Sequence, residues 1–192
     1  HSGPEWSRHE LNLNDISPRE LYETYLPAFK ALVQDADVRQ VMCAYQRLDD
    51  EPCCGNTRLL QRILRDEWGY EYMVVSDCGA VTDFFTTHNV SSDAVHAASK
   101  VVLAGADVEC VWETYPFMNL PEAVERDLIK EEDIDRSVVR LLTGRFYLGD
   151  FDDDATCDAV QAIVPGGGPD LAAAHDEKVG GIAGGYEALR IE

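Results

Sequence analysis

Apolar residues recur at helical spacing near the start of the chain, between two polar stretches. Ser17 can accept a hydrogen bond from the third helical amide while Glu20 bonds back to Ser17, which is the pattern of a capping box. We therefore predict a helix from Pro18 to Val33, kinked at Pro27 because proline interrupts the backbone ladder. Its apolar face consists of Leu21, Tyr22, Tyr25, Leu26, Phe29, Leu32 and Val33.

Two short apolar segments have the character of strands covered on both faces. They are residues 40–45 and 72–75, the second of which is continuously apolar. Between them, Asn56 can cap a helix that ends at Gly69, because Gly tolerates the left-handed conformation of a helix end. The apolar stripe of this helix is Leu59, Leu60, Ile63 and Leu64.

The alternation of helix and strand continues downstream. Ser92 opens a predicted helix, Gly105 closes it, and residues 106–110 resemble a third short strand. Strands separated by single helices indicate a parallel sheet, either doubly wound or a parallel (β/α) barrel. Residues 121–148 add two helical segments.

The composition changes after Phe151. Three consecutive aspartates and several glycine pairs follow, without the spacing of a phosphate loop or of a calcium loop. We predict a folded α/β domain over residues 1–150 and a Gly-rich linker or tail of uncertain structure over residues 151–192.

The charge balance excludes several classes of partner. The chain has 36 acidic and 16 basic side chains, a formal net charge of -20, which would repel nucleic acid and anionic membranes. No apolar run reaches the roughly 20 residues of a membrane span. We expect neutral or cationic partners, with no nucleic acid and no membrane among them.

Cysteine and histidine give no sign of a metal or redox site. The six cysteines form no C-x-x-C pair, and we expect small buried thiols, with one bridge from Cys53 or Cys54 left open. His88 and His96 lack metal-ligand spacing and are interpreted as solvated positions. No metal and no cofactor are expected.

Polar residues follow each predicted strand, where ligands bind in parallel α/β folds. Strand ends supply Tyr45, Asp77 and Glu109. Aromatic rings beside carboxylates and arginine suit a neutral polyhydroxylated ligand. The N-terminal loop adds Glu5, Trp6, Arg8, His9 and Glu10, of which His9 is interpreted as plain surface.

Several ordered motifs resemble glycoside hydrolase family 3, of the β-xylosidase and β-glucosidase type. The central ones are residues 41–45, 63–70 and 74–80, the last containing Ser76-Asp77-Cys78-Gly79. Residues 3–9 and 104–110 extend the resemblance to about the first 150 residues.

The resemblance implies a (β/α) barrel, of which this chain would be the C-terminal half. Asp77 matches the catalytic nucleophile of a retaining exo-β-glycosidase, and Arg8 and Tyr45 match residues of the sugar subsite. Trp6 could stack on sugar, and Glu109 is either a sugar ligand or a structural carboxylate at the barrel rim. The acid/base Glu and a Lys-His pair are expected outside this chain.

Two alternatives stay open. The first is a catalytically incomplete barrel fragment with weak sugar binding or a structural role. The second, a flavodoxin-like or dinucleotide-binding domain, is disfavoured because no strand is followed by Gly-x-Gly-x-x-Gly.

Because half a barrel has open strand edges, we expect a homodimer, pairing with a missing barrel segment, or aggregation.

Overall fold

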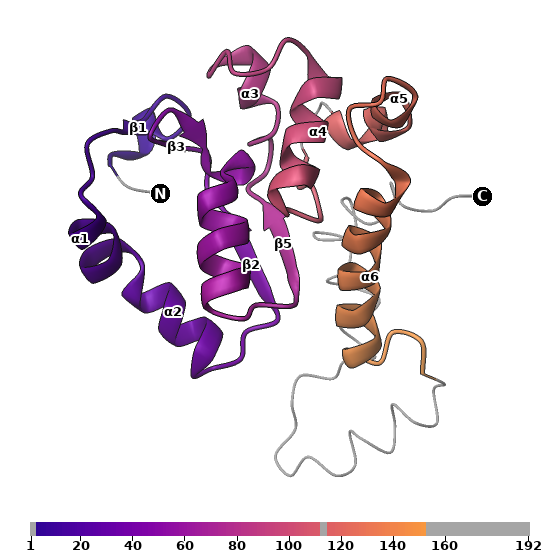
Figure 1. Cartoon of the computed structure of the whole chain (residues 1–192), viewed down its shortest axis with the longest axis horizontal. Coiled ribbons are helices and arrows are strands. Elements are labelled where there is room, and N and C mark those ends of the chain that lie inside the picture. Colours follow the sequence, from indigo (N-terminus) through magenta and orange to yellow (C-terminus); the bar gives the residue numbers. More distant parts are fainter. Residues whose placement is uncertain (1–2, 112–114, 153–192) are drawn as a thin grey trace. The chain divides into compact units, whose positions relative to one another are not determined.

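The computed structural model describes residues 3–111 and 115–152, which fall into two compact units, residues 1–144 and 145–192. The larger unit holds the elements discussed below (Figure 1). In the smaller unit, Arg145 pairs with Asp150 at 2.8 Å. Within the described ranges, no helix is both long and apolar enough for a membrane crossing.

The first helical region follows the predicted pattern. Ser17 and Glu20 form the capping box at the start of α1 (Pro18–Glu20). A π-helical turn, η2 (Leu21–Tyr25), precedes α2 (Pro27–Gln34), and the Leu26 amide donates to Leu21 O at 3.0 Å. The interruption before Pro27 confirms the predicted kink, because proline lacks the amide that would continue the ladder.

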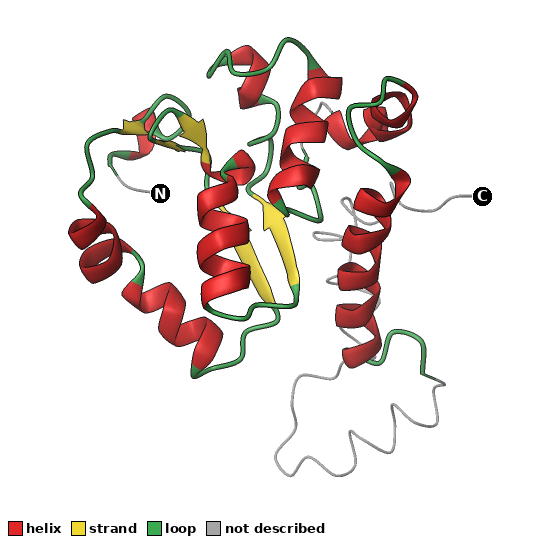
Figure 2. Cartoon of the chain, viewed as in Figure 1, coloured by secondary structure: helices red, strands yellow, loops and turns green. Residues whose placement is uncertain are grey.

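A parallel strand pair forms the centre of the unit. Strand β2 (Gln40–Cys43) pairs with β5 (Met73–Ser76) in the register Gln40↔Met73 to Cys43↔Ser76 (Figure 2). The connecting helix η4 (Arg58–Glu67) starts after Asn56, whose Oδ1 accepts from the Leu59 amide at 3.0 Å. Both predicted strands, the predicted cap and the helix are therefore confirmed.

The downstream helix begins one residue later than predicted. Asp93, not Ser92, caps α4 (Ala94–Ala104) by accepting from the His96 amide at 2.9 Å. Gly105 ends the helix with φ +98°. Its predicted successor, the strand 106–110, is reduced to one parallel bridge between Val75 and Val108. The helices α5 (Leu120–Glu125) and α6 (Glu131–Tyr147) match the two expected segments.

A small mixed sheet was not predicted. Strand β1 (Asn12–Leu13) pairs in parallel with β3 (Arg47–Leu48), which pairs antiparallel with β4 (Glu51–Pro52). Asp49 and Asp50 turn the hairpin with φ 51° and 68°, a left-handed pair typical of tight hairpin turns. Strands of two residues are too short to leave a periodic signal in the sequence.

The remaining short elements connect these parts. They are the 3-10 turns η1 (Glu5–Ser7), η3 (Cys53–Gly55) and η5 (Pro116–Asn119), and the helix α3 (Asp83–Thr86).

The fold class is confirmed only in its coarse form. The α/β alternation and the parallel pairing are present, but the described residues form a mixed sheet and a two-stranded sheet, with no closed barrel. Within that part of the chain, β2 pairs with a strand on one side only. The expected homodimer or missing barrel segment stays a prediction.

Two disulfides form among the cysteines, which were expected mainly as buried thiols. Cys43 pairs with Cys54, one of the two residues for which a bridge was left open, and Cys78 pairs with Cys110. Cys53 is buried and has no disulfide partner among the described residues. Burial raises the pKa of the Cys53 thiol to about 12, so this thiol stays protonated. The expectation of thiols was wrong for Cys43, Cys78 and Cys110, because the bridge partners are 11 and 32 residues apart and meet only in the folded chain.

An apolar groove of ≈ 500 Å³ lies on the side of β2 that faces η2 and α2. Its lining includes Leu26, Phe29, Val41 and Met42. Neither Asp77 nor Arg8 lines it, so this groove is separate from the predicted site.

A buried ionic cluster centred on Asp107 joins η4, α6 and β5. The fully buried Asp107 carboxylate pairs with Arg65 of η4 at 2.9 Å and with Arg140 of α6 at 2.8 Å. Its Oδ2 also accepts from the Val74 amide at 2.9 Å. Arg65 further donates to the carbonyls of Tyr70, Tyr72 and Gly105.

We predict that Asp107→Ala lowers the free energy of unfolding by about 3–5 kcal/mol, because it leaves the buried Arg65 charge uncompensated. Urea unfolding of the full chain, followed by circular dichroism, measures the loss. Glu23→Ala is the control, since Glu23 and Arg19 form an exposed pair whose removal costs about 0.5 kcal/mol or less. Equal losses in the two variants would contradict the central role of Asp107.

Candidate functional site

Asp77 lies directly after β5, at the carboxyl end of the β2–β5 strand pair. Its amide donates to Cys43 O at 3.0 Å, which extends the β2–β5 pairing by one bond. Its Oδ1 accepts from the Cys78 amide at 2.8 Å. The residue is only partly buried, so a carboxylate with a fixed orientation is open to a ligand.

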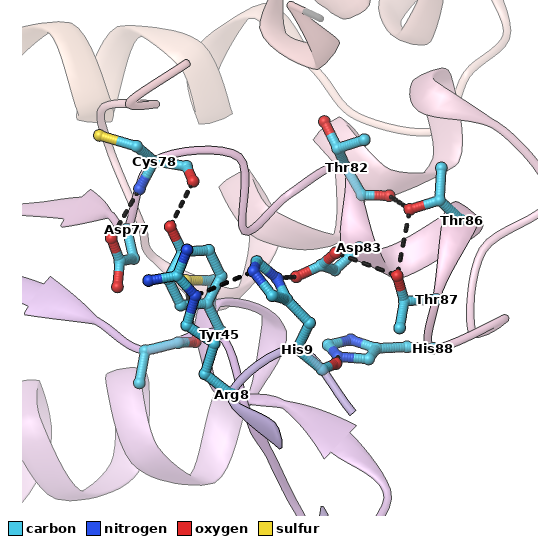
Figure 3. A network of polar contacts seen from close by, with 12 residues as sticks. Arg8, His9, Tyr45, Asp77, Cys78, Thr82, Asp83, Thr86, Thr87 and His88 are labelled. Carbon is cyan, nitrogen blue, oxygen red and sulfur yellow. Dashed lines mark hydrogen bonds and ion pairs between the residues drawn. The ribbon is translucent and has the colours of Figure 1, made fainter. Parts of the chain in front are cut away.

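Tyr45 lies after β2 and closes the same end of the pair. Its ring is buried, with 5% of the residue exposed. The hydroxyl donates to Cys78 O at 2.6 Å, so Tyr45 holds the turn that carries Asp77 (Figure 3). Two of the three residues predicted from the strand ends, Tyr45 and Asp77, are therefore brought together.

Arg8 reaches this cluster from the N-terminal segment. Its guanidinium carbon lies 4.9 Å from the centroid of the Tyr45 ring, a cation–π contact. Its Nε donates to His9 Nε2 at 3.0 Å, and its Nη1 pairs with Glu5 at 2.6 Å. The predicted placement of Arg8 near Tyr45 agrees with this geometry.

His9 and His88 are not plain surface residues, contrary to the sequence interpretation. His9 Nδ1 lies 2.6 Å from Asp83 Oδ2, and its ring packs 4.4 Å from the Tyr45 ring. His88 is buried, which lowers its pKa, and its Nε2 contacts His9 O at 2.7 Å. Sequence offered little warning, because Asp83 lies 74 residues from His9.

Glu109 follows Val108, which forms a parallel bridge with Val75 of β5. Its carboxyl is largely buried: Oε2 accepts from the Phe117 amide at 2.8 Å, whereas Oε1 is buried and has no hydrogen-bond partner among the residues that the structure describes. Burial raises the pKa of Glu109 to about 7. A carboxyl of this kind can donate or accept a hydrogen bond near neutral pH.

The disulfide Cys78–Cys110 ties the Asp77 turn to the Glu109 segment. Around it, the Cys110 amide donates to Ser76 Oγ at 3.0 Å and the Gly79 amide donates to Cys110 O at 2.8 Å. Because carboxyl ends of parallel strands meet, two cysteines closing adjacent strands were the signal that could have predicted this bridge.

Trp6 is placed differently from the other predicted residues. It lies on η1 and is 82% exposed. Its side chain is therefore exposed to solvent. Trp6 is two residues from Arg8 in the sequence, but its ring is not packed against Arg8 and Tyr45.

The described residues contain no group of three or more His, Cys, Asp or Glu side chains suited to hold a metal ion. The described residues bring together the open carboxylate of Asp77, the Arg8 guanidinium over the Tyr45 ring, and the buried carboxyl of Glu109, whose pKa is raised. Such a set can bind hydroxyl groups and attack an electrophilic carbon through the Asp77 oxygen.

Comparison with known proteins identifies similar sequences. A model described as the glycosyl hydrolase family 3 N terminal domain matches residues 2–143. A xylan 1,4-beta-xylosidase of Xylanibacter ruminicola is 65% identical over 153 residues, which is 80% of this chain and 18% of that protein. A probable exo-1,4-beta-xylosidase of Aspergillus clavatus is 40% identical over 149 residues, 76% of this chain and 19% of that protein.

Solved structures give a consistent result. A GH3 exo-beta-xylosidase bound to a xylobiose aziridine probe has a TM-score of 0.66 and 34% identity, covering 73% of this chain and 18% of that one. A beta-glucosidase from Listeria innocua in complex with glucose has a TM-score of 0.67 and 32% identity, covering 75% and 19%.

The chain thus spans less than a fifth of the length of these two curated relatives. The matched model is the N-terminal domain of its family, so the match does not support the narrower placement of this chain in a C-terminal part.

We predict a pH-dependent contribution of Glu109 to stability. Its pKa is about 7 in the folded state against 4.5 ordinarily, so the folded state binds the extra proton between these values. Stability contributed by the neutral carboxyl is complete below pH 4.5 and is lost as the pH rises to about 7. Glu109→Gln should remove this loss, of about 3 kcal/mol or less.

The measurement is urea unfolding of wild type and Glu109→Gln across this pH range. The stability difference between the two proteins should change in favour of the variant as the pH rises. A difference that stays constant with pH would show that Glu109 titrates normally.

Proposed function

The chain belongs to glycosyl hydrolase family 3, and from that premise we propose that it carries the nucleophile of a retaining exo-β-glycosidase. The proposal rests on Asp77, an open carboxylate fixed at the end of β5 by backbone contacts to Cys43 and Cys78. It is a glycoside hydrolase that removes terminal sugars through a covalent intermediate.

Asp77 would act as follows. A carboxylate oxygen attacks the anomeric carbon of the terminal sugar, the glycosidic bond breaks, and the leaving oxygen takes a proton from an acid/base carboxyl. Water, deprotonated by the same carboxyl, then hydrolyses the glycosyl ester and releases Asp77 as a carboxylate. The two carboxyls of a retaining enzyme lie about 5 Å apart, and the second is not assigned to this chain.

Arg8 and Tyr45 would form the wall of the sugar subsite. Arg8 uses Nε and Nη1 in its described contacts, which leaves Nη2 for a sugar hydroxyl. Tyr45 holds the Cys78 carbonyl and thereby the orientation of Asp77.

Glu109 and Trp6 would complete the subsite. Oε1 of Glu109 has no hydrogen-bond partner within residues 3–111 and 115–152, which supports a hydrogen bond to a hydroxyl of the bound sugar. The exposed ring of Trp6 supports stacking against the apolar face of a sugar unit.

We favour a β-xyloside over a β-glucoside as substrate. Both of the curated relatives compared above carry β-xylosidase names, including the one 65% identical to this chain. The neighbours in structure include β-glucosidases, so an aryl β-glucoside is the competing substrate.

A catalytically incomplete domain that binds sugar is the second candidate. The observation that favours it is the absence of a closed barrel among the described residues, where β2 has one strand partner. Such a domain would bind xylose without releasing an aryl group.

The test is release of the aryl group from an aryl β-xyloside and an aryl β-glucoside by the full-length protein. Asp77→Ala should lower kcat/KM by at least about a thousandfold, because no covalent intermediate can form. Asp66→Ala, which removes an exposed carboxylate of η4, is the control and should keep full activity.

Two results would count against the proposal. Full activity of Asp77→Ala would show that the nucleophile is another residue. Sugar binding without turnover by a folded wild-type protein would favour the incomplete domain.

A further inference from the structure

We propose that Asp83 and His9 are positioning residues, which hold the Arg8 guanidinium against Tyr45 and so set the affinity for the sugar bound beside Asp77. This inference rests on the proposed function, because it assumes that Arg8 contacts the sugar. It gives His9 a defined role and adds Asp83, which no motif of the chain placed near the site.

Two hydrogen bonds link Asp83, His9 and Arg8, and a cation–π contact continues from Arg8 to Tyr45. Figure 3 shows the His9 ring between Arg8 and Asp83, with Tyr45 beside it and Cys78 at the far side of Tyr45. Asp83 Oδ2 lies 2.6 Å from His9 Nδ1, and Arg8 Nε lies 3.0 Å from His9 Nε2. Arg8 in turn lies over the Tyr45 ring, whose hydroxyl holds Cys78 O.

The donors and acceptors of this chain fix one tautomer of His9. The guanidinium of Arg8 can only donate, so His9 Nε2 must accept and cannot carry a proton. The proton therefore sits on Nδ1, where the Asp83 carboxylate accepts it. Without Asp83, the tautomer with a proton on Nε2 would turn a donor toward the Arg8 donor and break the contact.

Asp83 is itself firmly held. It is buried, and its Oδ1 accepts from Thr87 Oγ1 at 3.1 Å. Its carbonyl accepts from the amides of Thr87 at 3.0 Å and His88 at 2.7 Å. Asp83, the first residue of α3, is thus anchored by Thr87 and His88, which follow that helix.

His88 fixes the other side of His9. Its Nε2 donates to the His9 carbonyl at 2.7 Å, while its Nδ1 is buried with no hydrogen-bond partner in the described part of the chain. Burial lowers the pKa of His88, which keeps it neutral and consistent with a proton on Nε2 alone. Asp83 therefore contacts the ring of His9, and His88 contacts its backbone carbonyl.

A second histidine–aspartate pair allows the positioning role of His9 to be separated from a purely structural one. A second pair, His96 and Asp93, has the same Nδ1-to-carboxylate contact at 2.9 Å and nearly the same exposure of the histidine side chain, 41% against 40%. The other nitrogen of His9 contacts Arg8, whereas the His96 pair sits at the start of α4. His96 is therefore a matched control.

The test compares three variants of the full-length protein on an aryl β-xyloside. His9→Phe keeps a ring beside Tyr45 and loses both hydrogen bonds, so KM should rise about tenfold with kcat within about threefold. His9→Gln restores an acceptor for Arg8 Nε and should recover most of the loss. His96→Phe should leave both constants unchanged.

Asp83→Ala adds an independent check. It should raise KM as much as His9→Phe, and the double variant should be no worse than either single variant, because both remove the same support of Arg8. A fall in kcat with unchanged KM, shared by His9→Gln, would show a structural role only and would overturn the proposal.

A spectroscopic measurement separates this proposal from the proposed function. Nitrogen NMR of histidine-labelled protein should show His9 protonated on Nδ1 and unprotonated on Nε2 near neutral pH, whether or not the protein is active. Loss of this signature in Asp83→Ala would support the chain of contacts. Protonation of Nε2 in the wild type would overturn it, and an inactive wild type with the expected tautomer would refute only the proposed function.

Discussion

The Asp107 carboxylate, buried between Arg65 and Arg140, is the constraint on which the rest of the larger unit depends. A buried charge of this kind is tolerated only when its oxygens are fully paired, and here the Val74 amide adds a third donor. Because Arg65 belongs to η4 and Arg140 to α6, one side chain fixes two helices against β5.

That constraint reaches the site through the backbone. Asp107 and Val108 both donate to Val74 O, and the Val75–Val108 bridge sets the segment that carries Glu109 and Cys110 in register with β5. The disulfide from Cys110 to Cys78 and the Tyr45 hydroxyl then fix the Asp77 turn from two sides. The open carboxylate is therefore held by contacts that begin in the core.

Sequence was most informative where a pattern is local. The capping box at Ser17, the caps at Asn56 and Gly105 and the apolar strands all follow from neighbouring residues. What failed depends on residues far apart: the two disulfides and the contact of His9 with Asp83 form only once strands and loops have met. The motifs predicted Asp77, Arg8 and Tyr45 as candidate site residues, whereas the contacts that support these side chains became visible only in the structure.

The Cys78–Cys110 bridge gives the site a dependence on the place where the protein is made. Disulfides form in oxidising compartments and are rare where thiols are kept reduced. A chain folded in a reducing cytosol would lack the disulfide that joins Cys78, in the Asp77 turn, to Cys110, in the segment that carries Glu109. Recombinant production therefore bears on the geometry of this site as directly as a substitution within it.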